Sequence, residues 1–235
     1  MTSTSSTAGT DAAASVAEPV DRRRLLRVAA FGGIGAFVAW LVQPILVSIF
    51  SPLAPEGGPD FAYIESTPYN GVMEATVFAG IGVGLLFMVT AVGRLIVPSS
   101  TAARVGQTMG IVGAAVWFLV AGGSLGTYTS VGWWLSEAAP DPELQQALYQ
   151  TLGIAMTGTL VTFAVGMIGW LILLGTAGRR ARVVGWPLAV VAFAAAAISA
   201  GTFLFPFAPP WGSIASIFAG FVLGIAFLVK ARKAR

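Results

Sequence analysis

Few side chains in this sequence carry the chemistry of an active or binding site, and the most informative one is Glu74. The chain contains no His and no Cys, which removes imidazole ligands, the commonest general base and thiolate nucleophiles. Glu74 ends a Pro- and Gly-rich loop, residues 51–74, and enters the apolar run that follows. A carboxylate just inside a membrane is costly unless it faces water or a partner, so Glu74 is a candidate proton, cation or ligand site.

A purely structural explanation of Glu74 stands beside this one. A carboxylate in the first turns of a helix, at the wet edge of a membrane, is stabilised by the positive end of the helix dipole and needs no function. The same applies to Gln43, which lies beside Pro44. Pro44 cannot donate to the carbonyl of Trp40 and should bend the helix there. Gln43 beside this bend either forms hydrogen bonds that hold neighbouring helices together or binds a ligand.

The remaining candidate site residues are polar side chains expected at the same depth as Glu74. In the fourth apolar segment, Gln146, Gln150 and Thr157 are spaced so that they share one helical face. Tyr128 closes the third segment in an aromatic-rich exit. The sequence therefore predicts a shallow, outward-facing polar cavity that binds a ligand through Glu74, Gln43, Tyr128, Gln146, Gln150 and Thr157.

Several kinds of chemistry lack their residues. Paired-imidazole haem, Ser–His proteolysis and the usual zinc sites all need His. Lys230 and Lys233, the only lysines, lie at the end of the chain, where neither can form a mid-span Schiff base with retinal. No GxxxxGK phosphate loop is present. We therefore predict no cofactor, no metal and no catalytic residue.

The elements that must position these residues are apolar helices. The chain is 56% hydrophobic and 10% charged, with a mean hydropathy of +0.83, against about 25% charged residues in soluble domains. The predicted fold is an all-α, polytopic membrane bundle with a disordered tail at 1–20 and one membrane domain at 21–235. Six transmembrane helices are expected at about 25–50, 72–97, 105–128, 147–176, 184–205 and 211–229.

The positive charges set the expected orientation. All 13 Lys and Arg residues fall before or at the start of the first span, at the end of the second span or between the second and third, between the fourth and fifth, or after the sixth. The positive-inside rule then puts both termini in the cytoplasm of a multi-pass cell-membrane protein, and it favours an even number of spans. Basic residues clustered beside apolar runs are typical of membrane orientation, so we expect no nucleic-acid partner.

Local motifs add detail to the helices. Asp141, Pro142 and Glu143 have the order of a helix start, with a capping acceptor, a proline in the first turn and a carboxylate at the positive dipole end. Three alternating glycines at 80, 82 and 84 predict one face without side-chain bulk, against which another helix packs closely. Gly106 with Gly110, and Gly122 with Gly126, have the four-residue spacing of close membrane-helix contacts.

Three functions remain open. The first is a non-catalytic accessory subunit or helix bundle that binds membrane lipids, a membrane protein partner or further copies of itself. The second is a small oligomeric transporter or channel that uses Glu74. The third is a lipid-modifying enzyme of the envelope, which would work from the outer-face acids Glu65, Glu74, Glu137, Asp141 and Glu143. The Arg-rich start and the Gly- and Ala-dense spans resemble small bacterial membrane proteins in composition, without a motif match.

Overall fold

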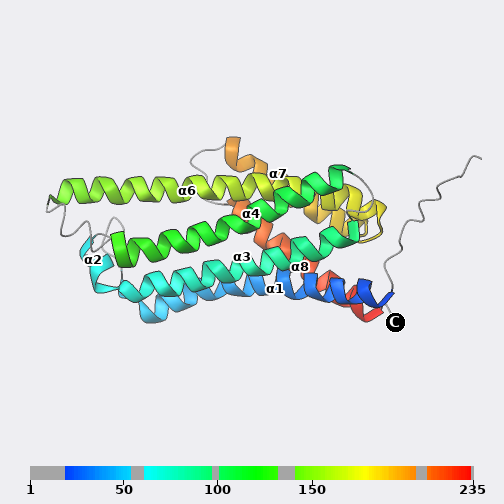
Figure 1. The fold of residues 1–235 in the computed structure, drawn as a ribbon, viewed down its shortest axis with the longest axis horizontal. Helices are drawn as coiled ribbons and strands as arrows, with labels where there is room; N and C mark the ends of the chain where they lie inside the picture. Colours follow the sequence, from blue (N-terminus) through cyan, green and yellow to red (C-terminus); the bar gives the residue numbers. More distant parts are fainter. Residues whose placement is uncertain (1–18, 54–60, 97–100, 132–140, 205–210, 234–235) are drawn as a thin grey trace, which may run out of the picture.

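Helices make up nearly all of the part of the chain that the structure describes. The computed structural model describes residues 19–53, 61–96, 101–131, 141–204 and 211–233 (Figure 1). Its elements are α1 (Pro19–Phe50), α2 (Phe61–Ser66), α3 (Pro68–Ile96), α4 (Thr101–Gly126), the π-helical turn η2 (Thr127–Val131), α6 (Pro142–Leu173), the π-helical turn η3 (Leu174–Gly178), α7 (Trp186–Leu204) and α8 (Trp211–Lys233). These residues form no strand, which confirms the predicted all-α class.

Five of the described helices, α1, α3, α4, α6 and α8, have apolar stretches of 22 to 30 residues, long enough to cross a membrane. They lie over five of the predicted spans. The sixth predicted span coincides with α7, whose apolar stretch Trp186–Gly201 is shorter. Most of the predicted tail, residues 1–18, lies outside the described residues, and α1 begins at Pro19.

The long helices form a ring in chain order. Each packs on the next, from α1 to α3, α4, α6, α7 and α8, and α8 packs back on α1. Figure 1 shows α1, α3, α4 and α6 side by side. Large side chains fill the centre, and Leu85, Met88, Phe163, Trp170 and Phe227 are all fully buried. Every helix of the ring is therefore held by two neighbours and by a shared apolar core.

Glycines let the helix backbones approach closely at the crossings. A side chain at Gly84 would meet the backbone of Gly32 and Ala36 on α1, and one at Gly166 of α6 would meet the backbone of Gly113 on α4. Because lipid is as apolar as the helices, close packing of small residues is what holds membrane helices together. The ring is built on such contacts.

The predicted single glycine face of α3 is wrong. Gly80 and Gly84 face α1, whereas Gly82 faces Trp117 and Phe118 of α4. The two other glycine pairs divide as well. Gly106 and Gly110 pack against Leu173 and Trp170 of α6, as expected for close contacts, but Gly122 and Gly126 have open space beside them.

The basic segments meet at one end of the ring, which we call the basic end. It holds the start of α1, the end of α3, the start of α4, the turn after η3 and the end of α8 (Figure 1). Nη2 of Arg22 donates to the carbonyl of Arg182 at 3.2 Å. Nζ of Lys230 donates to the same carbonyl and to that of Val183, the latter at 3.1 Å. The basic clusters of the sequence are therefore gathered at one end of the ring, and α2 lies at the other end.

Candidate functional site

Glu74 lies in the second turn of α3, on the side that faces α4. Its side chain is half-buried, and the Ser124 hydroxyl of α4 lies within hydrogen-bonding reach of it. Ser124 itself is buried, with 2% of its surface exposed. The helix begins at Pro68, four residues earlier than the expected start of the span. The carboxylate is thus placed against a neighbouring helix, beyond the first turn in which the helix dipole alone would stabilise it.

Tyr128 belongs to the same α3–α4 seam. Gly71, one turn before Glu74, packs against the side chain of Tyr128 and the carbonyl of Ser124. The seam continues inward through aromatic contacts, since Phe78 lies 5.7 Å from Trp117, measured between ring centroids. Glu74 and Tyr128 are therefore the two predicted site residues that the structure brings to one seam.

The other four predicted site residues lie elsewhere. Gln43 is half-buried on α1, which is separated from α4 by α3. Gln146, Gln150 and Thr157 are exposed on the first half of α6, and the Thr157 hydroxyl donates to the carbonyl of Gly153 at 2.9 Å. These residues do form a polar stripe on α6, but the structure does not bring them to the seam that holds Glu74.

The described acids of the enzyme alternative, Glu65, Glu74, Asp141 and Glu143, belong to three different helices, α2, α3 and the start of α6. Glu65 is exposed on α2, and Glu143 is exposed at the start of α6. Asp141 accepts a hydrogen bond from the Glu143 backbone at 2.9 Å, so it caps α6, which confirms the predicted helix start. Glu137 lies outside the described residues.

A polar network near α2 escaped the sequence analysis. The Ser51 hydroxyl donates to Oδ1 of Asn70 at 2.6 Å, and Nδ2 of Asn70 donates to the Tyr63 hydroxyl at 3.4 Å. That hydroxyl donates to the Pro52 carbonyl at 3.1 Å. Asn70 is 3% exposed, so its pairing stabilises the end of α1 against α2 and α3. No local pattern in the sequence signals this network, because Ser51 and Asn70 are 19 positions apart.

A second buried pair joins α7 and α8. The hydroxyls of Ser199 and Ser216 lie 3.1 Å apart, and the Ser199 hydroxyl donates to the Gly212 carbonyl at 3.0 Å. Both serines are completely buried. Hydroxyls that bond across two apolar helices hold those helices together, so these serines are structural.

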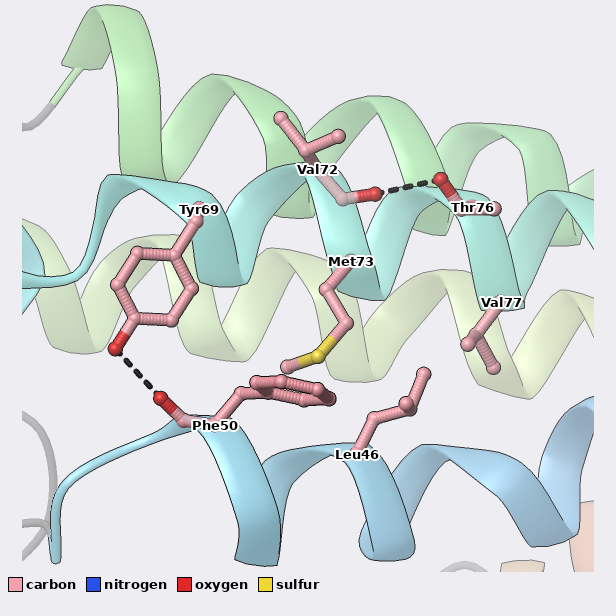
Figure 2. A pocket seen from close by; sticks show the side chains of 7 residues that line it. All are labelled: Leu46, Phe50, Tyr69, Val72, Met73, Thr76 and Val77. Carbon is pink, nitrogen blue, oxygen red and sulfur yellow. Dashed lines mark hydrogen bonds between the residues drawn. The ribbon is translucent and has the colours of Figure 1, made fainter.

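The hollow of greatest interest lies between α1 and α3, near the α2 end (Figure 2). It has a volume of about 690 Å³ and is lined by Leu46, Phe50, Tyr69, Val72, Met73, Thr76 and Val77. The two hydroxyls in its lining are occupied locally. Tyr69 donates to the Phe50 carbonyl and Thr76 to the Val72 carbonyl, each at 2.7 Å. We call this hollow the outer groove. Because its hydroxyls are already bonded to the backbone, it offers an apolar surface, which suits a hydrocarbon chain.

The outer groove was not visible in the sequence, because its lining residues are ordinary apolar residues of two helices. None of the six predicted site residues lines it. Comparisons of the chain with protein-family models, with curated proteins and with solved structures found no match.

Proposed function

We propose that this chain is a non-catalytic membrane protein that binds a lipid or an apolar segment of a membrane partner in the outer groove between α1 and α3. The observation that supports this proposal is the groove itself, a hollow of about 690 Å³ with an apolar lining whose hydroxyls are already bonded to the protein. A groove of this kind recognises a ligand by shape and apolar contact, which favours a binding function over catalysis.

The proposal includes six crossings with both termini in the cytoplasm of a cell membrane. It is supported by the gathering of the basic segments at one end and by the ring of helices that alternate in direction around it. In this arrangement α7, with its shorter apolar stretch, is the fifth crossing. The outer groove then opens to the lipid of the outer leaflet.

A bulky residue in the groove tests the binding function. Val72 lines the groove and is 55% exposed, so Val72→Trp fills the hollow without disturbing the core. Val112→Trp on α4, where Val112 is 49% exposed, is the matched control. Native mass spectrometry after purification in mild detergent should show a lipid or protein on wild type and on the control that Val72→Trp lacks. The same bound species on all three proteins would contradict the proposal.

A transporter that uses Glu74 is the second candidate, because the carboxylate lies half-buried between two apolar helices beside Ser124. Intramembrane carboxylates are the usual carriers of protons in transport proteins. Proteoliposomes that contain a trapped pH dye report the flux. Glu74→Gln should abolish it, and Glu143→Gln, an exposed acid at the start of α6, should leave it intact. Equal flux in wild type and Glu74→Gln would remove this candidate.

A further inference from the structure

The α1–α3 seam contains a second hollow, nearer the middle of the bundle, with a volume of about 440 Å³. Its floor consists of Gly32 and Gly84, where the two backbones approach most closely, and its length is set by Gly35 and Gly80. No atom lies within 4 Å of a side chain built at Gly35. Glycine at these positions therefore leaves a furrow on the surface of the bundle.

Two aromatic side chains border this furrow. Phe31 of α1 is 66% exposed and Phe87 of α3 is 57% exposed. Bulk lipid chains cover a convex apolar surface without any groove, so a helix pair that only faces lipid does not need aromatic side chains on both sides of a glycine furrow. Exposed rings on both sides of a glycine floor border a channel whose apolar lining suits a hydrocarbon chain.

The furrow runs into a third hollow at the basic end. This one has a volume of about 560 Å³ and shares Val28 and Phe87 with the furrow, so the two hollows adjoin each other. Its polar lining includes Arg24 from α1 and Arg94 from α3, together with Thr90 and Asp21. Both guanidinium groups belong to exposed residues, one on each side of the seam.

From the glycine furrow to the hollow at the basic end, the lining changes from apolar to cationic, in the same order as the acyl chain and headgroup of a phospholipid. Two guanidinium groups outweigh the single carboxylate of Asp21 at the polar end, and arginine pairs well with phosphate oxygens. Basic residues next to a membrane surface attract anionic lipids, each contributing about 1 kcal/mol. A headgroup without net negative charge would gain less from this arrangement than an anionic one.

We propose that the inner part of the α1–α3 seam is a binding site for one anionic phospholipid. Its phosphate lies between Arg24 and Arg94, and one acyl chain lies along Gly35 and Gly80 between Phe31 and Phe87. This inference rests on the proposed lipid-binding function and adds a ligand class at a separate part of the seam. None of the residues that line the outer groove takes part.

The headgroup half of the site is tested with phosphatidylglycerol added to the purified protein in neutral detergent. Native mass spectrometry gives the fraction of protein that retains a lipid. The double variant Arg24→Gln/Arg94→Gln should bind about thirtyfold more weakly than wild type, since it loses two such contributions. The control Arg27→Gln/Arg104→Gln removes two exposed arginines of α1 and α4 that do not line the hollow, and it should bind like wild type. Equal weakening of both variants would overturn the site.

The acyl half is tested by filling the furrow. Gly35→Leu places a side chain in open space on the furrow, and Gly122→Leu does the same on α4, far from the seam. Phosphatidylglycerol binding should fall about tenfold in Gly35→Leu and stay unchanged in Gly122→Leu. Wild-type binding by Gly35→Leu would overturn the placement of the chain in the furrow.

Two further arms define the ligand. Phosphatidylcholine of the same chain length should bind about tenfold more weakly than phosphatidylglycerol, and equal binding would overturn the role of the arginines. The deacylated headgroup, glycerophosphoglycerol, should not displace the lipid, and full displacement would overturn the two-part site. Val72→Trp should keep phosphatidylglycerol, so that its loss of an outer-groove ligand and a failure of this inference remain distinguishable.

Discussion

At the scale of residues, Lys230 and Arg22 together join three parts of the chain that are distant in sequence. Lys230 lies near the end of α8, and its Nζ reaches the carbonyls of Arg182 and Val183 in the turn before α7. Arg22 at the start of α1 donates to the first of these carbonyls as well. Arg182 has a positive φ of 55°, which directs the turn toward these donors. The basic end is thus closed by side chains that bind backbone.

Lys230→Met should destabilise the protein by about 1–3 kcal/mol, because two carbonyls lose a charged donor. Lys233→Met is the control, since Lys233 is exposed on the same last turn. Thermal unfolding in detergent measures the difference. A melting temperature that falls equally in both variants would show that charge at the helix end matters and the two hydrogen bonds do not.

Asn70 gives a second test at this scale. Asn70→Ala removes the acceptor of Ser51 and a donor to Tyr63 in a buried network, which should cost about 1–3 kcal/mol. Ser66→Ala removes only a local bond to the Tyr63 carbonyl and should cost little. Limited proteolysis of the 51–74 loop reports the loss. Identical cleavage rates in the two variants would be inconsistent with an organising role of Asn70.

The residue scale is also where sequence reasoning found Glu74 and missed Asn70. A carboxylate in an apolar run is conspicuous in any sequence, and the structure places it at a helix seam. Asn70 meets Ser51 across 19 positions of the chain. That pairing depends on how the loop returns α3 to α1, and no local pattern records it.

At the scale of elements, the α1–α3 crossing depends on glycine. A side chain at Gly84 would meet the Gly32 carbonyl at 2.6 Å and the Ala36 nitrogen at 2.7 Å. Gly84→Val should therefore separate the helices and cost about 1–3 kcal/mol. Gly35→Val adds the same side chain in open space on the partner helix and should cost much less. The two melting temperatures, measured in one detergent, give the comparison, and equal values would contradict the packing at this crossing.

Helical geometry explains why the predicted glycine face of α3 divides between two neighbours. Residues two apart point to nearly opposite sides of a helix, whereas residues four apart share a side. Gly80 and Gly84 therefore face α1 together, and Gly82 faces α4. That division was deducible from the spacing. The grooves were not, because they arise from the separation of two helices at each depth, and their lining residues have no distinctive type.

At the scale of the whole molecule, the sequence predicts the arrangement better than the site. Long apolar runs and clustered arginines indicate a helical membrane protein. The described residues form five long apolar helices, and their basic segments meet at one end. The predicted polar cavity drew on residues from four segments. Of these residues, only Glu74 and Tyr128 lie in the same seam between two helices. The expected depth of a residue in the membrane does not tell which face of its helix the residue occupies.

The central claim is the orientation of the chain in the membrane, because this orientation decides on which side the outer groove, the proposed lipid site and Glu74 lie. The native chain has no Cys, so single cysteines report their own positions. Glu65→Cys and Ala208→Cys should react with an impermeant maleimide on intact cells. Arg104→Cys and Arg180→Cys should react only after the cells are opened. Labelling in the reverse pattern, or Ala208→Cys that reacts only in opened cells, would contradict six crossings with the basic end in the cytoplasm.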